Sequence, residues 1–439
     1  MILRSMQNLP HATPSSPTSR KRPTPSGAGP RRSFLTRILA PLTVAPLVWL
    51  GGHAMAAQAA QNQATHNQPP AAGCRASTEW PLWDSFNERF AQEDGRIVDF
   101  NVAQMHSTSE GQSYAMFFAL VANQPERFER LWRWTVANLA GGNIAARLPA
   151  WQWGQRKDGT WGIIDNNPAS DADLWLAYAL LEAARVWKKP AYEADARTLL
   201  ARVIQDELID LPGFGKMVLP GPVGFSFPDQ KLWRFNPSYL PLPLLRRFAQ
   251  FDPKGPWTAL ASNTVRLISD TAPRGYSPDW VAWRLVDNGR GGFVADPQLG
   301  DVGSYDAIRT YLWAGMTAPT DPAATPLRRA LGGMAQAIEQ AEFPPEKVQT
   351  STGAVQGMGP IGFAAALLPY LQTDGRNTAL QLQQKRVQAR LFDPAARLPY
   401  YDHVLGLFGT GWIEKRYQFL PTGRLQLRWE KACSTATKR

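Results

Sequence analysis

Three acidic residues stand in similar local settings at distant points of this 439-residue chain. Glu110 lies in the segment SEGQSY (109–114), Asp171 in ASDAD (169–173), and Asp306 in SYDAIR (304–309). Each segment opens a stretch rich in aromatic residues with apolar positions at helical spacing. Carboxyl groups that converge at one end of a helical assembly, beside many tryptophans, could carry out acid/base chemistry on a sugar polymer.

Cleavage of a glycosidic bond requires one carboxylic acid to protonate the leaving oxygen and one carboxylate to activate water or attack carbon. Glu110 suits the acid, because its longer side chain can reach the scissile oxygen and burial would raise its pKa. Asp306 suits the base, with Arg309 one helical turn later to hold it ionised. Asp171 would lie between them and hold a sugar hydroxyl or a distorted ring. The structural alternatives are helix N-caps for the two aspartates and a capping-box or first-turn residue for the glutamate.

The chain contains 17 tryptophans, and the usual place of a tryptophan is the core. Those in the expected loops are better candidates to stack on pyranose faces: Trp151, Trp153, Trp233 and Trp280. Four charged residues are further candidates to line the same cleft: Asp165, Asp173, Arg234 and Asp279.

The sequence offers few suitable residues for metal-dependent, serine-nucleophile or phosphate-binding sites. Only His106 and His403 fall in the expected folded part, too few for a histidine-rich metal site, and they leave little from which to build a serine triad. A phosphate-binding glycine loop of the Walker type is missing from the sequence. We therefore expect neither a metal nor a cofactor.

Residues 1–56 carry seven basic residues and no acid, and the first acid of the chain is Glu79. The pair Arg31-Arg32 precedes an apolar stretch over 38–50 and the small-residue site 54–56, which predicts an export signal that resembles the twin-arginine type. The alternative is a membrane anchor, but the apolar stretch is short and interrupted by prolines, so we expect no stable membrane span after signal removal. The expected location is periplasmic or secreted.

The formal net charge is +11, and seven of these positive charges belong to residues 1–56. The rest of the chain shows no basic stripe, so we expect no nucleic-acid partner. Residues 57–73 are rich in Ala, Gln, Asn and Pro and predict a flexible linker, followed by a single catalytic domain over 74–439. Cys74 and Cys433, near the two ends of that domain, could form a disulfide in an oxidising compartment.

Apolar residues at three- and four-residue spacing recur along the domain, whereas strand-like alternation is scarce. The predicted helices span 80–91, 109–122, 126–139, 171–187, 190–207, 237–250, 257–269, 304–317, 324–342, 360–371, 374–392 and 400–413. Every second helix is strongly apolar, and several of those between carry charges on one face, as expected for buried helices covered by amphipathic ones. The pattern predicts an all-α (α/α)6 barrel (toroid) of six inner and six outer helices, with the three acids at one end. The loops 140–170, 208–236 and 270–303 would form the rim of a groove.

The segment ASDADLWLAYALLEA (169–183) resembles the signature of glycoside hydrolase family 8, with Leu176 where Ile or Met is usual. SEGQSY resembles the general-acid segment of that family, and YDAIR (305–309) its general-base segment. The resemblance implies an (α/α)6 barrel, an inverting mechanism, β-1,4-glucan as substrate and no cofactor. It implies that Glu110 is the acid, Asp306 the base and Asp171 a substrate-binding residue needed for catalysis, and that Tyr239 helps to position the water.

Within the family, the chain looks most similar to the periplasmic endoglucanases of bacterial cellulose-synthesis operons. The similarity runs from about 74 to 433 and includes RLPAW (147–151), WRFNPSYLP (233–241), YSPDW (276–280) and PPEK (344–347). The expected protein is a monomeric endo-β-1,4-glucanase that hydrolyses cellulose with inversion and acts on nascent glucan, with the cellulose synthase complex as a candidate partner. The alternatives are a xylanase of the same family and a catalytically silent glucan-binding component of the export machinery. A terpene-cyclase-like barrel ranks below these, because its acidic motifs are absent.

Overall fold

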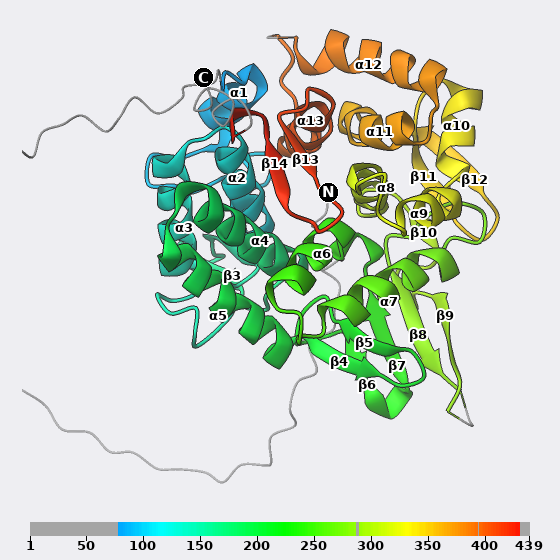
Figure 1. Cartoon of the computed structure of the whole chain (residues 1–439), viewed down its shortest axis with the longest axis horizontal. Helices are drawn as coiled ribbons and strands as arrows, with labels where there is room; N and C mark the ends of the chain where they lie inside the picture. Colours follow the sequence, from blue (N-terminus) through cyan, green and yellow to red (C-terminus); the bar gives the residue numbers. More distant parts are fainter. Residues whose placement is uncertain (1–77, 287–288, 394, 431–439) are drawn as a thin grey trace, which may run out of the picture. The chain divides into compact units, whose positions relative to one another are not determined.

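The computed structural model describes residues 78–430, except 287, 288 and 394. Its helices form two concentric rings (Figure 1). The inner helices are α2 (Ser109–Val121), α4 (Ser170–Trp187), α6 (Leu242–Phe251), α8 (Ala307–Met316), α11 (Ile361–Thr373) and α13 (Tyr400–Ile413). The outer helices are α1 (Pro81–Phe90), α3 (Pro125–Asn138), α5 (Pro190–Asp206), α7 (Trp257–Asp270), α9 (Ala324–Ala330), α10 (Gly333–Ala341) and α12 (Asn377–Leu391).

Each inner helix contacts the next inner helix along the chain, and it also contacts an outer helix. The ring closes where Phe118 of α2 meets Phe408 of α13, with their ring centroids 4.7 Å apart. Helices α2 and α8 are buried at every residue, because each is surrounded by inner neighbours and an outer helix. These contacts confirm the predicted (α/α)6 barrel.

The prediction of the third inner helix, over 237–250, was wrong at its start. Pro237–Tyr239 forms a 3-10 turn, and α6 begins only at Leu242. Leu240 precedes a proline, which disfavours the α conformation, and it adopts φ −118° and ψ 68° instead. Helix α6 is also buried on one face only, unlike α2 and α8.

The predicted helix 324–342 is divided into α9 and α10. The break falls at Leu331 and Gly332, where the helix-weakening pair Gly332-Gly333 occurs. The backbone N–H of Gly333 donates to the carbonyl of Gly275 at 3.1 Å, so the chain is held by a neighbouring loop at this point. The division follows from this close backbone approach.

Short antiparallel strands occupy the segments expected to be loops. They form the sheets β1-β2-β3, β4-β5, β6-β7-β8-β9 and β10-β11-β12. Their bounds are β1 (Ser107–Thr108), β2 (Gln152–Gln155), β3 (Trp161–Asp165), β4 (Leu208–Leu211), β5 (Gly215–Val218), β6 (Ser226–Phe227), β7 (Leu232–Phe235), β8 (Val281–Leu285), β9 (Gly291–Ala295), β10 (Val302–Gly303), β11 (Pro345–Gln349) and β12 (Ala354–Met358). All of them precede the starts of inner helices, so they surround the end of the barrel at which the inner helices begin.

After α13, the last strands of the described residues form a hairpin of β13 (Tyr417–Phe419) and β14 (Leu425–Leu427). Tyr417 packs edge-on against Phe117 of α2 with centroids 5.0 Å apart. The hydroxyl of Tyr178 on α4 donates to the carbonyl of Gly423 at 2.8 Å. The hairpin therefore packs against inner helices beyond the end of α13, away from the helix starts.

None of the helices in the described residues is both long and apolar enough to cross a membrane. The predicted export signal (1–56), the linker (57–73) and the Cys74–Cys433 disulfide fall on positions outside the described residues and stay predictions.

Candidate active site

Glu110 is the second residue of α2, and the start of this helix fixes its direction. The Thr108 hydroxyl caps the helix by accepting the N–H of Gly111 at 3.1 Å. The Glu110 carboxyl is buried and accepts a hydrogen bond from the indole Nε1 of Trp151 at 3.1 Å. Burial, followed by the charge of Asp171, raises the pKa of Glu110 to about 8. Glu110 is therefore protonated at neutral pH, as a general acid must be.

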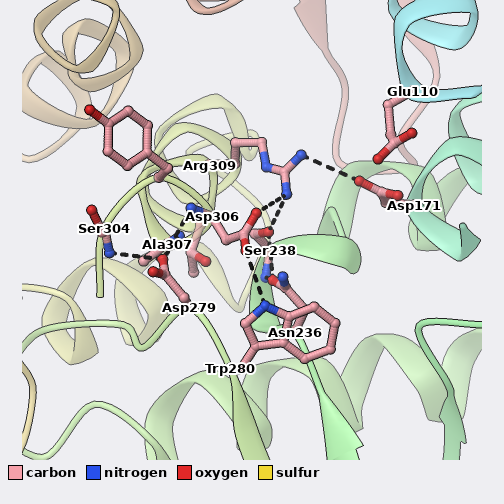
Figure 2. Close-up of polar contacts among 12 residues, drawn as sticks. Glu110, Asp171, Asn236, Ser238, Asp279, Trp280, Ser304, Asp306, Ala307 and Arg309 are labelled. Carbon is pink, nitrogen blue, oxygen red and sulfur yellow. Dashed lines mark hydrogen bonds and ion pairs between the residues drawn. The ribbon is translucent and has the colours of Figure 1, made fainter. Parts of the chain in front are cut away.

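Asp306 occupies the N-cap position of α8, and its two oxygens accept from different donors. Oδ1 accepts from Nη2 of Arg309 at 3.0 Å, and Oδ2 accepts from Nε1 of Trp280 at 3.1 Å (Figure 2). Burial raises the pKa of Asp306 above its ordinary value, and Arg309 and the Trp280 hydrogen bond oppose this rise. The guanidinium thus favours the carboxylate form that a general base requires.

Arg309 connects the base to the third acid. It is 2% exposed, and its Nη1 lies 3.4 Å from Oδ2 of Asp171, at the start of α4. Figure 2 shows Asp171 and Arg309 between Glu110 and Asp306. Burial raises the pKa of Asp171 to about 6, with Arg309 acting in the opposite direction. The three predicted acids and Arg309 are therefore brought together, and the two proposed catalytic carboxyls are set apart by an intervening ion pair.

A hydrogen-bonded chain holds Arg309 from the opposite side. Nη2 of Arg309 donates to the Ser238 hydroxyl at 3.0 Å, and this hydroxyl donates to Oδ1 of Asn236 at 2.7 Å. The Tyr114 hydroxyl lies 3.3 Å from Nη1 of Arg309 and 3.5 Å from Oδ2 of Asp171. The sequence predictions omitted Asn236, Ser238 and Tyr114 as functional residues. The spacing of Tyr114 four residues after Glu110 was the available signal, since it places both residues on one helix face.

Tyr239, the predicted water-positioning residue, lies against this group. Its ring is 5.6 Å from the Arg309 guanidinium and meets the ring of Trp280 edge-on at 5.9 Å. Tyr401, at the start of α13, also borders the site, and its hydroxyl donates to the carbonyl of Tyr305 at 2.7 Å. Tyr401 was not predicted, because its place depends on the closure of the barrel. Water positioning by Tyr239 stays a prediction.

The four tryptophans expected to stack on sugars are placed differently. Trp151 and Trp280 are 7% and 3% exposed, and each donates its indole N–H to one of the proposed catalytic carboxyls. Trp233 is 8% exposed within the sheet of β7 and β8. Trp153 is partly covered by Trp161, which stacks on it at 5.5 Å and is itself 42% exposed. Sugar stacking by the four stays a prediction, whereas Trp161 is an exposed ring that the sequence analysis did not select.

The remaining charged candidates have structural partners or lie away from solvent. Arg234 forms a buried two-pronged ion pair with Asp296 at 2.7 and 3.0 Å, and its guanidinium lies 5.2 Å from the Trp280 ring. Asp173 is fully buried and does not line a cleft. Asp165 accepts the backbone N–H of Asn167 at 2.9 Å and so shapes its own turn.

Within the part of the chain that the structure describes, no three His, Cys, Asp or Glu side chains gather in a way that could hold a metal ion. The side chains described above for the site include carboxyls, a guanidinium, phenols and indoles.

Comparison with known proteins assigns this chain to a family. The family model described as glycosyl hydrolases family 8 matches residues 67–415. An endoglucanase of Pseudomonas fluorescens (strain SBW25) is 47% identical over 370 residues, covering 81% of this chain and 93% of that protein. An endoglucanase of Escherichia coli (strain K12) is 42% identical over 362 residues, covering 82% and 95%.

Among solved structures, the endo-1,4-D-glucanase of Vibrio fischeri ES114 superposes with a TM-score of 0.75 at 41% identity, covering 80% of this chain and 99% of that one. The family match extends across all six inner-helix starts, including the segments that carry the three acids. The chain therefore belongs to glycosyl hydrolase family 8 and is a glycoside hydrolase.

Proposed function

We propose that the protein is an endo-β-1,4-glucanase that cleaves internal bonds of cellulose with inversion of the anomeric configuration. The observation that carries the proposal is the contrast between two carboxyls at one end of the barrel. The buried Glu110 keeps its proton, because burial and the charge of Asp171 raise its pKa to about 8. Asp306 is held beside the Arg309 guanidinium at 3.0 Å, which favours its ionised form. Carboxyls in opposite protonation states are the requirement for glycosidic cleavage.

The proposed reaction takes place in one step. The Glu110 carboxyl donates its proton to the glycosidic oxygen as the bond from that oxygen to the anomeric carbon breaks. A water molecule attacks the anomeric carbon from the opposite face, and its proton passes to the Asp306 carboxylate. Asp171 and Arg309 lie between the two groups, which supports a separation wide enough for water rather than direct attack by a carboxylate.

Asp171 has the position of a substrate-binding residue rather than a proton carrier. Its Oδ1 accepts the N–H of Ala172 at 2.9 Å and its Oδ2 faces Arg309 at 3.4 Å. We propose that it holds a hydroxyl of the distorted sugar and, through its charge, keeps the pKa of Glu110 high. This second effect couples substrate binding to the proton supply.

The names of the relatives support β-1,4-glucan as the substrate, since the Vibrio fischeri protein is described as an endo-1,4-D-glucanase. We further propose that the protein acts in the periplasm or outside the cell on glucan that is being made and exported. An operon partner such as a cellulose synthase complex is part of this proposal, as is action as a monomer.

The first test measures viscosity loss and reducing-end release on carboxymethyl cellulose for the parent, Glu110→Gln and Asp306→Asn. A rapid viscosity drop in the parent that both substitutions abolish supports an endo-acting hydrolase with these two roles. Equal or faster cleavage of xylan would assign the protein to xylanases instead. Cellulose binding without cleavage would favour a silent glucan-binding component. The anomer formed first, followed by NMR, decides inversion: a retained configuration contradicts the mechanism.

A further inference from the structure

Asp279 lies in the loop before β8, two residues ahead of its first residue, and one of its oxygens accepts from three backbone donors. Oδ1 accepts the N–H groups of Ser304 at 2.8 Å, Asp306 at 3.0 Å and Ala307 at 2.7 Å (Figure 2). These donors come from the turn that leads into α8, which begins at Ala307. A side chain from a separate loop thus accepts the free N–H groups at the start of the helix that carries Asp306.

The start of a helix leaves N–H groups without an intrahelical acceptor, and an aspartate at the N-cap ordinarily satisfies one of them with its own side chain. Asp306 is at this N-cap, yet within the described structure its side chain makes no capping hydrogen bond. Its two oxygens accept instead from Arg309 and Trp280. An Asp306 side chain that capped its own helix would turn toward the backbone and away from these donors.

We propose that Asp279 is a positioning residue for the general base: it accepts the N–H groups at the start of α8 and thereby leaves the Asp306 carboxylate directed at the reacting water. This inference rests on the proposed function, in which Asp306 is that base. The neighbouring residue Trp280 completes the arrangement, because it donates to Oδ2 of Asp306 at 3.1 Å. The dipeptide Asp279-Trp280 therefore fixes both the backbone and the side chain of the base.

The role requires a hydrogen-bond acceptor rather than a negative charge. Burial, followed by the charge of Asp306, raises the pKa of Asp279 to about 7. The neutral carboxyl is thus well populated near neutral pH, and its carbonyl oxygen can accept the N–H groups. Asparagine has nearly the same shape and keeps this acceptor. Leucine has the same branched arrangement of side-chain atoms, is larger, and lacks the acceptor.

The experiment compares Asp279→Leu and Asp279→Asn on carboxymethyl cellulose and on soluble cello-oligosaccharides. Asp279→Leu should lower kcat at least about 100-fold with KM within about twofold, because a misdirected base fails in the transition state while the subsites stay intact. Asp279→Asn should recover at least about tenfold of that loss. Parental kcat in a folded Asp279→Leu variant, or an Asp279→Asn variant as inactive as Asp279→Leu, overturns the proposal.

If circular dichroism shows that Asp279→Leu does not fold, Asp279→Ala is measured in its place, because the smaller side chain leaves room for water. Asp279→Ala should still lose at least about tenfold in kcat. A parental kcat of Asp279→Ala would also overturn the proposal.

Asp402 supplies a matched control for loss of a helix cap. Its Oδ1 accepts the N–H of Gly362 at 3.0 Å at the start of α11, which carries none of the proposed catalytic residues. Asp402→Leu should lower Tm and leave kcat per folded molecule near the parental value. A kcat loss equal to that of Asp279→Leu would show a general effect of helix fraying and overturn the specific role.

Asp306→Asn is measured in parallel to separate the two proposals. Parental activity of Asp306→Asn refutes the proposed function itself. An inactive Asp306→Asn together with fully active Asp279 variants refutes the positioning role alone.

Discussion

At the scale of single residues, two indoles donate to the proposed catalytic carboxyls and influence their protonation. Trp151 donates to Glu110 and Trp280 donates to Asp306, at 3.1 Å in each case. An N–H donor stabilises the charged form of a carboxyl and so lowers its pKa. For Glu110 this effect opposes burial, which is the largest influence on its pKa. The charges of Asp171, which raises this pKa, and of Arg309, which lowers it, also act, and the balance of all these effects determines the pH at which the acid loses its proton.

This balance predicts the alkaline limit of activity. Because Glu110 must be protonated and its pKa is raised to about 8, kcat/KM of the parent should fall as pH rises through about 8. Trp151→Phe removes the donor that lowers this pKa, so the alkaline limb should move upward, by about one pH unit. Trp280→Phe is the paired control: it should move the acidic limb upward through Asp306 and leave the alkaline limb in place. An alkaline limb unaffected by Trp151→Phe would contradict the role of this hydrogen bond.

Arg309 gives a second prediction at this scale. It is buried against Asp171 and Asp306, and it lowers the pKa of both. Arg309→Met should shift the acidic limb of kcat/KM to higher pH, reduce kcat at least about 100-fold, and lower the free energy of unfolding by about 3–5 kcal/mol, since two buried carboxyls lose their cation. Urea unfolding and pH–rate profiles measure these effects.

Arg309→Lys separates charge from geometry. Lysine keeps the positive charge but cannot present two nitrogens in a fixed fork to two carboxyls and the Ser238 hydroxyl. It should recover part of the stability and little of the kcat. Full activity of Arg309→Lys would show that the charge alone suffices.

At the scale of helices, close packing of the inner ring depends on glycines that face neighbouring backbones. A Cβ added at Gly409 of α13 would lie 1.8 Å from the carbonyl oxygen of Ala365 on α11. Gly409→Ala must therefore push the two helices apart and should lower the free energy of unfolding by about 1–3 kcal/mol or more. Gly292 in β9 meets nothing within 4 Å and serves as the matched control, for which Ala should be nearly neutral. Equal Tm values for the two variants would contradict tight α11–α13 packing.

The helices were predictable from sequence because their apolar spacing is strong and local. The predicted 109–122 and 171–187 lie within one residue of α2 and α4 at either end. The errors fall where prolines or close backbone contacts override periodicity, as at Leu240 and Gly332. The short strands were missed because segments such as Gln152–Gln155 are too short for a clear alternation, and this one forms by pairing with both the nearby β3 and the distant β1.

The three acids of the site were predictable from sequence, whereas several of the contacts that hold them were not. Glu110, Asp171 and Asp306 could be chosen because each stands at the start of a helix of the same ring, and parallel inner helices bring their starts together. The donor roles of Trp151 and Trp280 were not foreseen, because they join residues 41 and 26 positions apart through the loop sheets. The capping of α8 by Asp279 escaped prediction for the same reason, since local spacing contains no information about contacts across loops.

At the scale of the whole molecule, Asp173 and Glu207 impose a dependence of stability on pH. Both are fully buried, and none of their four carboxyl oxygens has a hydrogen-bond partner among the described residues. Burial raises the pKa of both well above the ordinary range, and the charge of Glu207 adds to this for Asp173. In the unfolded chain the same groups ionise near pH 4. Because the folded pKa values are the higher ones, stability is fully present below about pH 4 and decreases as pH rises toward them.

The double variant Asp173→Asn/Glu207→Gln removes both ionisations while keeping similar shapes. Its free energy of unfolding should therefore vary less with pH than that of the parent, and the difference should favour the variant by at least about 1 kcal/mol more at pH 8 than at pH 4.5. Urea unfolding at the two pH values measures this difference. Asp158→Asn is the control: Asp158 is exposed, and its hydrogen bonds with Thr160 lower its pKa, so it titrates below this range and should leave the pH dependence unchanged. A double variant with the same pH dependence as the parent would mean that the fold supplies these two carboxyls with partners that stabilise their charges.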